Sequence, residues 1–226
     1  MPSTLSRPFY ARATLKVARD LLGAVLVRRI DDETVLRARI VETEAYVGEH
    51  DKACHARAGR TPRTDVLYGP PGIAYIYLTY GMHYLLNAVT EPEGFPAAVL
   101  IRAAEPLEGI EWMRRARRVE NDRLLAAGPA RLTQALGLDL RHNRADLRGP
   151  VLWIEEGEPH LDSAVAQSPR VGCHTAPPPW DRMPWRFYVA GSPFVTPGTR
   201  GLGPSPTGPA PDAGKTRGGN RATHRG

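Results

Sequence analysis

The chain has 226 residues, of which 42% are hydrophobic and 24% are charged, the composition of a soluble globular protein. This length suits one domain with a sizeable core, or one domain and a tail. No stretch approaches the ~20 apolar residues of a membrane helix. Residues 1–12 also lack the apolar core and cleavage site of a secretory signal. We therefore expect a cytoplasmic protein that contacts no membrane.

The positive charge is concentrated near the C-terminus. The whole chain carries a net +6, and its isoelectric point of about 9.6 indicates a polyanionic partner. Residues 197–226 hold five basic residues against one aspartate, a net +4, which leaves only +2 for residues 1–196. Those last 30 residues include eight glycines and five prolines, so we expect a disordered basic tail there. Residues 1–196 then form the single domain.

Two cysteines, Cys54 and Cys173, exclude a disulfide scaffold. Each is followed by a histidine, so a Cys2His2 metal site is an alternative. Structural zinc sites usually pair their ligands two to four residues apart, which this spacing does not do. We favour two reduced thiols and expect no metal site.

In chain order, the first element is a helix over residues 14–22, with Leu15, Ala18 and Leu21 on one face. Thr14 is expected to cap its start and Gly23 to end it. Strands are expected at residues 24–29, 35–41, 73–77, 83–89 and 97–102. The polar stretch 48–72 is unusually long for a connection, which indicates a functional loop.

The second half of the domain predicts helices over residues 107–118 and 124–137, the second interrupted and restarted at Gly128-Pro129. Strands follow at 151–155 and 186–189. Strand runs come in succession rather than alternating with helices. We therefore expect an α+β single domain with a mainly antiparallel, curved sheet flanked by helices.

The densest group of chemically active side chains lies in residues 39–46, where the period of two puts Glu42, Glu44 and Tyr46 on one strand face. Tyr75, Tyr77 and Tyr80 follow, leading into a tight turn. Aromatic side chains stack on bases, and a side chain at a tip can replace a base withdrawn from the stack. Taken singly, such tyrosines more often form a buried sheet face, and such glutamates are more often surface charges.

Several motifs together carry more information than each alone. Their order and spacing strongly resemble the alkyladenine (3-methyladenine) DNA glycosylase family over about residues 8–195. The motifs are Arg39-Ile-Val-Glu-Thr-Glu-Ala-Tyr46, Cys54-His55, Tyr75-Ile-Tyr77-Leu-Thr-Tyr80-Gly-Met82, Asn87, Leu100-Ile-Arg102-Ala-x-Glu-Pro-Leu-Glu-Gly, Gly128-Pro-Ala-Arg-Leu-Thr-Gln-Ala-Leu136, Arg170-Val-Gly172 and Arg186-Phe-Tyr-Val-Ala-Gly-Ser-Pro193.

The resemblance implies a catalytic role for two residues. Glu44 matches the family's general base, which holds the attacking water, and Arg102 matches the arginine beside that water. It also implies a base pocket, made of an aromatic clamp, main-chain groups that meet the purine edge, and a residue that disfavours the amino group of guanine. Tyr46, His55 and Tyr77 match the clamp, and the main chain from Ala53 to His55 matches the groups that meet the purine edge. Asn87 matches the residue that disfavours the amino group of guanine.

The DNA contacts follow from the same resemblance. Tyr80 matches a wedge that enters the minor groove from a protruding β-hairpin, with Met82 beside it. Gly128 to Arg131 match a turn that meets phosphate near a helix start. Arg60 and Arg63 are expected on the DNA backbone, although their loop is slightly shorter than the family's. His83 stands where family members carry an aromatic residue.

The implied function is base-excision repair. The expected partner is double-stranded DNA with damaged purines, 3-methyladenine and also hypoxanthine, bound by a monomer that would be nucleoid-associated in a bacterium. The enzyme is expected to be monofunctional, without lyase activity, metal or cofactor. One alternative is a catalytically silent nucleic-acid-binding module. Another is a glycosylase/lyase using the Pro2 amine, disfavoured because that family's zinc-finger cysteines are missing. A zinc deaminase would need H-x-E and P-C-x-x-C motifs, which are absent.

Overall fold

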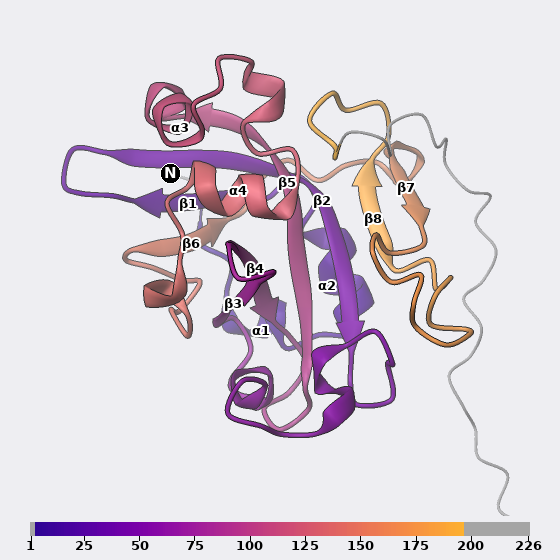
Figure 1. Ribbon diagram of the computed structural model, residues 1–226. Coiled ribbons are helices and arrows are strands. Elements are labelled where there is room, and N and C mark those ends of the chain that lie inside the picture. Colours follow the sequence, from indigo (N-terminus) through magenta and orange to yellow (C-terminus); the bar gives the residue numbers. More distant parts are fainter. Residues whose placement is uncertain (1–2, 197–226) are drawn as a thin grey trace, which may run out of the picture.

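The computed structural model describes residues 3–196, so Pro2 and the predicted tail at 197–226 lie outside the described residues. Its centre is one antiparallel sheet of eight strands, ordered β3-β4-β5-β2-β1-β6, with β8 pairing both β2 and β7 (Figure 1). The strands are β1 (Val25–Arg29), β2 (Val35–Val47), β3 (Ala74–Thr79), β4 (His83–Val89), β5 (Ala97–Glu108), β6 (Leu152–Glu155), β7 (Val165–Ser168) and β8 (Arg186–Val189). This sheet with a few helices agrees with the predicted α+β class.

The helices are short and lie on both faces of the sheet. Figure 1 shows α2 behind β2 and α4 in front of the sheet. The α-helices are α1 (Arg7–Tyr10), α2 (Thr14–Asp20), α3 (Ile110–Arg117) and α4 (Pro129–Ala135). The 3-10 helices are η1 (His55–Ala58), η2 (Asp65–Tyr68), η3 (Asp122–Leu124), η4 (Leu140–His142) and η5 (Asp162–Ala164). None of the helices between residues 3 and 196 is long and apolar enough to cross a membrane.

The start of α2 corrects the predicted cap. Thr14 is the first helical residue rather than the N-cap, which is Ala13. The carboxylate of Glu91 instead accepts from the Thr14 amide at 2.7 Å and from its hydroxyl at 2.9 Å. A tertiary contact therefore satisfies the helix start, with the negative charge that suits the positive end of a helix dipole.

Two strands are longer than predicted. β2 continues six residues past residue 41, and β5 reaches Glu108, because Arg37 and Ala38 of β2 pair with Glu108 and Pro106. The first predicted helix of the second half therefore starts at Ile110 rather than at 107. At Gly128 the backbone has φ +135°, a conformation that favours glycine, and Pro129 occupies the first turn of α4, as predicted. β7, α1 and the 3-10 helices lack a strong periodic pattern and were not predicted.

Strand β2 positions the site. On β5, Ala104 pairs with Ile40 and Ala103 with Glu42, so Val41 is an extra, unpaired residue in a β-bulge. Beyond the bulge, the Thr43 hydroxyl donates to the Ala18 carbonyl of α2 at 2.7 Å, on the covered face. Glu42, Glu44 and Tyr46 alternate with Thr43 and share the opposite face.

The long polar loop has a small core of its own. Apolar side chains from the loop pack with residues of β3, β4 and β5, and Tyr46 and Tyr77 pack against them. The cluster comprises Cys54, Ala56, Val66, Leu67, Tyr68, Ile73, Tyr75, Val89 and Ala98. This packing holds the loop beside Tyr46 and Tyr77, two residues of the predicted clamp.

Candidate active site

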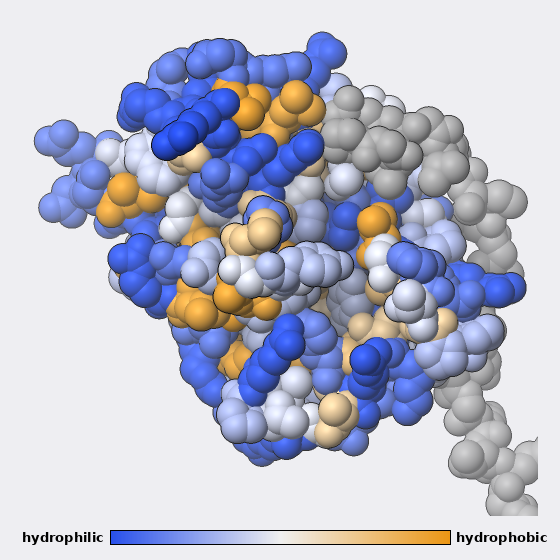
Figure 2. Space-filling view, in the orientation of Figure 1, coloured by the Kyte–Doolittle hydropathy of each residue, from blue (hydrophilic) through white to orange (hydrophobic). Residues whose placement is uncertain are grey.

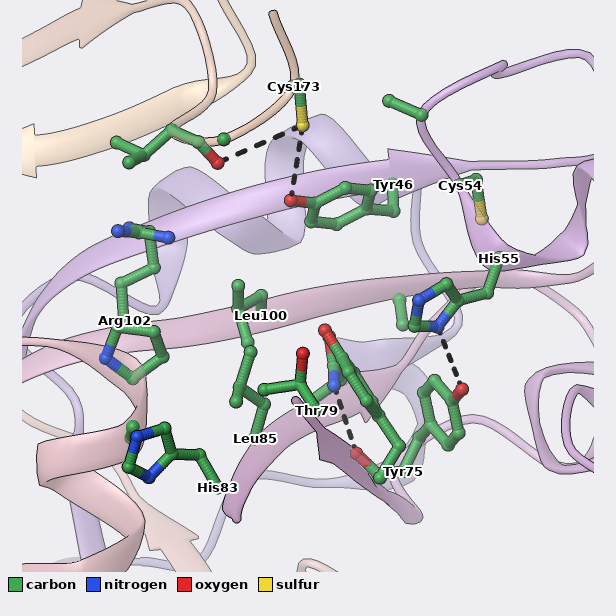
Figure 3. A pocket seen from close by; sticks show the side chains of 18 of the residues that line it. Tyr46, Cys54, His55, Tyr75, Thr79, His83, Leu85, Leu100, Arg102 and Cys173 are labelled. Carbon is green, nitrogen blue, oxygen red and sulfur yellow. Dashed lines mark hydrogen bonds between the residues drawn. The ribbon is translucent and has the colours of Figure 1, made fainter. Parts of the chain in front are cut away.

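A cavity of about 390 Å³ opens on the face of the sheet that carries α4, and its size is typical of a small-ligand site (Figure 3). Its walls come from β2, β3, β4, β5, the 53–55 loop, the start of α4 and the 171–173 loop. Among its lining residues are all five predicted base-pocket residues and three further predicted site residues or neighbours: Tyr46, Ala53, His55, Tyr77, Asn87, Tyr80, His83 and Arg102.

Glu44 lies directly behind the cavity wall and is 0% exposed. Its Oε2 accepts from the Tyr46 hydroxyl at 2.8 Å and lies 3.3 Å from Nη1 of Arg102. Its Oε1 accepts from the Val171 amide at 2.7 Å. All three partners line the cavity, so the carboxylate is held one layer behind the surface that a ligand would touch.

Behind Glu44, a second carboxylate completes a buried charge network. Oε1 of Glu42 accepts from Nε of Arg102 and from Nε of Arg186, each at 2.8 Å. Its Oε2 accepts from the Thr196 amide at 2.8 Å and from the Thr196 hydroxyl at 2.6 Å. Two carboxylates and two guanidinium groups thus neutralise one another in the interior, as buried charges require.

This pairing sets the ionisation of the network. Burial alone would raise the pKa of Glu42, but Arg102 and Arg186, with the bonds from Thr196, hold it below its usual value. Burial would likewise lower the pKa of Arg102, yet Glu44 and Glu42 outweigh it and raise that pKa. Glu42 had no role assigned beyond its strand face. Only the fold shows that it anchors Arg102.

The aromatic wall is built from three neighbouring rings. The His55 ring meets the Tyr77 ring edge-on, with centroids 4.5 Å apart, and Tyr75 and Tyr77 lie 5.2 Å apart. Nδ1 of His55 is 2.9 Å from the Tyr75 hydroxyl. Burial, followed by the charges of Arg63 and Arg57, lowers the pKa of His55 to about 4, so the ring is neutral at pH 7. In Figure 3, Tyr46 lies along another wall, with Arg102 at the far end from His55.

The Asn87 side chain and the main chain at residues 53–54 are each held in place by hydrogen bonds. The Asn87 side chain is buried and donates to the Tyr75 carbonyl at 3.1 Å. The Ala53 amide donates to the Asp51 carboxylate at 3.0 Å, and the Cys54 amide to the Asp51 carbonyl at 2.9 Å. Of the main-chain groups predicted to meet a purine, these two amides are therefore engaged with Asp51.

Arg170 supports Tyr46 from behind and was not assigned a role from the sequence. Its guanidinium pairs with both Asp51 oxygens at 2.5 and 2.9 Å, and both side chains are fully buried. It also donates to the Ala45 carbonyl at 2.9 Å. It lies 4.7 Å from the Tyr46 ring centroid and 5.0 Å from that of Trp185. Arg170 thus joins β2, the pocket loop and the 171–173 segment.

One of the predicted DNA-contacting residues, Tyr80, lines the cavity, and Gly128 directly precedes the lining residue Pro129. Tyr80 and Met82 are 89% and 69% exposed at the tip of the β3–β4 hairpin, where Tyr80 has φ +51°. Gly128 starts α4, whose Pro129 and Ala130 line the cavity, and Arg131 is exposed. Figure 2 shows several separate apolar patches on this face among strongly hydrophilic residues.

Two predicted DNA-backbone arginines lie in different surroundings. Arg60 is paired with Asp65 at 2.8 Å and lies over the Tyr68 ring. Arg63 lies with its guanidinium 5.2 Å from the Tyr77 ring centroid, and Nη2 is 3.5 Å from Nε2 of His55. Both are exposed, but Arg63 contacts the aromatic wall of the cavity.

Cys54 and Cys173 both line the cavity. Burial is the main cause that raises the pKa of each thiol, that of Cys54 to about 12, so both are protonated at neutral pH. The Cys173 sulfur is 3.7 Å from the Tyr46 hydroxyl. Within residues 3–196, no three His, Cys, Asp or Glu side chains are grouped so that they could hold a metal ion.

Comparison with known proteins agrees with the motif pattern. The family model described as methylpurine-DNA glycosylase (MPG) matches residues 8–193. A protein of Chlorobaculum tepidum is 44% identical over 192 residues, 85% of this chain and 90% of its own length. A protein of Myxococcus xanthus is 49% identical over 195 residues, 86% of this chain and 94% of its own.

A protein of Methanocella arvoryzae is 50% identical over 194 residues, 85% of this chain and 95% of its own length. All three relatives carry a provisional assignment as 3-methyladenine DNA glycosylases. The family match over residues 8–193 includes every residue that lines the cavity. The alignments with the three relatives each cover about 85% of the chain. The chain therefore belongs to the methylpurine-DNA glycosylase family of DNA-repair glycosylases.

Proposed function

We propose that this protein flips alkylated or deaminated purines, 3-methyladenine and also hypoxanthine, out of duplex DNA and hydrolyses their N-glycosidic bond. Glu44 is the proposed base that activates water. The observation that carries this proposal is the bonding of Glu44 to Tyr46 and Arg102, two residues of an aromatic cavity large enough for a purine. A catalytic carboxylate is thereby joined to a base-binding wall.

In the proposed reaction, the bond between C1′ and the base nitrogen breaks and the base leaves with the electron pair. The sugar passes through an oxocarbenium-like state, as in glycoside hydrolysis. Water oxygen bonds to C1′ while its proton passes to Glu44. The carboxylate also stabilises the developing positive charge, and Arg102 orients it. Attack requires water to reach Glu44 between Tyr46, Arg102 and Val171.

The base is proposed to bind between aromatic side chains. A flipped purine can stack on Tyr46, His55 and Tyr77, and a cationic methylpurine gains cation–π attraction from the tyrosines. A neutral base such as hypoxanthine is a poorer leaving group and needs a hydrogen bond or a proton. Asn87, fixed to Tyr75, is proposed to narrow the pocket against the amino group of guanine.

The proposed DNA contacts use the same face. Tyr80, with Met82 beside it, fills the gap left in the stack, and its exposure at the hairpin tip supports this role. Gly128, Arg131 and Arg60 are proposed to meet the phosphate backbone. The protein is proposed to act as a monomer in the cytoplasm, on the nucleoid if bacterial.

The enzyme is proposed to be monofunctional. No lysine is among the residues that line the cavity of the described chain, so no side-chain amine is placed there to form a Schiff base. A duplex with 3-methyladenine or hypoxanthine should lose free base and keep an intact abasic strand. Borohydride trapping of a protein–DNA adduct would overturn monofunctional action. If the duplex is bound without any base release, the chain is a silent binding module.

A further inference from the structure

Each of the two clamp tyrosines, Tyr46 and Tyr77, has a guanidinium on one ring face. Arg170 lies 4.7 Å from the centroid of Tyr46, and Arg63 lies 5.2 Å from that of Tyr77. Neither arginine lines the cavity, although both tyrosines do. The rings therefore stand between the base pocket and two cations.

The location of Arg63 is defined by a second cavity. β3 is an edge strand of the sheet, and a hollow of about 350 Å³ lies against it. Tyr75 and Tyr77 line both this hollow and the base pocket, whereas Arg63 lines only the hollow. Arg63 consequently lies on the side of the Tyr77 ring that faces away from a bound base.

The two arginines differ in whether a carboxylate neutralises their positive charge. Arg170 is neutralised by Asp51 through two hydrogen bonds in the interior. Arg63 pairs with no carboxylate of the described residues. Its neighbours are the Tyr77 ring and Nε2 of His55. The Tyr77 wall thus carries an uncompensated positive charge, and the Tyr46 wall does not.

We propose that Arg63 is a specificity-determining residue whose guanidinium, stacked on the outer face of Tyr77, reduces the preference of the base pocket for positively charged purines over neutral ones. A ring's negative face attracts a cation, but a second cation across the same ring repels it. A neutral purine loses nothing by this arrangement. Arg63 then widens the range of lesions toward uncharged bases. This inference rests on the proposed function.

His55 does not provide the same effect. Burial is the main cause that lowers its pKa to about 4, so the ring stays neutral at pH 7. The charge of Arg63 is the second cause of this lower pKa, but burial, the main cause, remains when Arg63 is replaced. The substitution therefore removes one positive charge at the aromatic wall. The methionine variant Arg63→Met also keeps an unbranched stem to cover Tyr77.

The test compares two duplexes of identical sequence, one with 3-methyladenine, which is cationic, and one with hypoxanthine, which is neutral, each opposite thymine. For each duplex, the rate of single-turnover excision is measured at saturating protein. The equilibrium affinity is measured by titrating the duplex with protein. Arg63→Met should raise the cationic-to-neutral ratio of the affinities by about 2- to 5-fold, the range of an exposed cation–π contact. It should not raise the ratio of the saturated excision rates, because a cationic base loses its charge as it leaves. Arg63→Lys keeps the charge and should stay near the wild-type ratio.

Arg60→Met is the matched control, because it removes the same charge from the same loop but Arg60 is paired with Asp65 and lies over Tyr68. Its ratios should equal those of the wild type. If Arg63→Met lowers the affinity for both duplexes by the same factor, the ratio is unchanged. Arg63 would then be a phosphate contact, and the inference would be overturned. If the wild type releases neither base, the proposed function fails, and the affinity ratio still decides the role of Arg63.

Discussion

The hydroxyl of Tyr46 donates a 2.8 Å hydrogen bond to Oε2 of Glu44, so a wall of the base pocket is bonded to the proposed catalytic carboxylate. The two side chains are two residues apart on β2 and project to the same face. Burial, and then the Glu44 charge, raises the pKa of Tyr46 far above its usual value, which keeps it a hydrogen-bond donor. The proposed base binding and the proposed water activation are therefore coupled through one bond.

Glu44→Gln should abolish base release while DNA binding persists. Glutamine keeps the size of the side chain but removes the proton acceptor and the negative charge. General base catalysis contributes about 10²- to 10⁴-fold, and loss of charge stabilisation adds to that. Single-turnover release from a 3-methyladenine or hypoxanthine duplex measures this. Glu105→Gln, which breaks only the ion pair with Arg39, is the control and should stay near wild type. Rapid excision by Glu44→Gln would exclude it as the base.

Glu42→Gln should affect stability more than chemistry. All four groups that Glu42 binds are donors, from Arg102, Arg186 and Thr196, so a glutamine NH2 would face another donor. Breaking a buried ion pair by removing one partner costs about 3–5 kcal/mol. Urea unfolding should show a loss of that order. Excision at low temperature, where the variant is folded, should remain substantial, because Glu44 is intact. An unchanged free energy of unfolding would contradict the network.

Tyr80→Ala should weaken the capture of lesions in duplex DNA. The side chain is largely exposed at the hairpin tip, so its removal leaves the fold intact. The loss should be smaller when the target base is unpaired, since unstacking then costs less. Affinity and single-turnover excision on a paired and a bulged lesion provide the comparison. The same loss on both substrates would refute the wedge assignment.

Truncation after Thr196 should flatten the dependence of log affinity on log salt, since residues 197–226 carry a net +4. Saturated single-turnover excision should not change. Truncation after Val195 is the matched comparison, because it also removes the two hydrogen bonds from Thr196 to Glu42. This shorter chain should be less stable than the chain that ends at Thr196. A large loss of the saturated rate in the chain that ends at Thr196 would show that the tail takes part in chemistry.

His55 should make the fold sensitive to acid. Its pKa is about 4 in the folded protein and 6.5 as an ordinary side chain. Between these values the unfolded chain binds a proton that the folded chain does not, so stability falls as pH decreases from 6.5 towards 4. His55→Asn should have a flatter decline of Tm between pH 7 and pH 5, even if its Tm at pH 7 is lower. If the Tm of His55→Asn falls with decreasing pH as steeply as that of the wild type, His55 is not the source of the acid sensitivity.

Local patterns in the sequence predicted much of the sheet and several features of the site. The period of two placed Glu42, Glu44 and Tyr46 on one face, and Gly128-Pro129 marked the start of α4. The turn at Tyr80 was recognisable between two strand patterns, β3 and β4. These features depend on residues close in sequence, whose geometry is set by backbone periodicity and by the conformational limits of glycine and proline.

Other features depended on the tertiary structure, because they join residues that no local pattern relates. Glu91 caps α2 from 77 residues away, and Thr196 binds Glu42 from 154 residues away. Asp51 and Arg170 meet behind Tyr46 over a separation of 119 residues. A buried charge must find a partner, but its sequence does not specify which of many arginines or carboxylates that will be. Only the folded sheet, by bringing β2, β5 and β8 together, decides it.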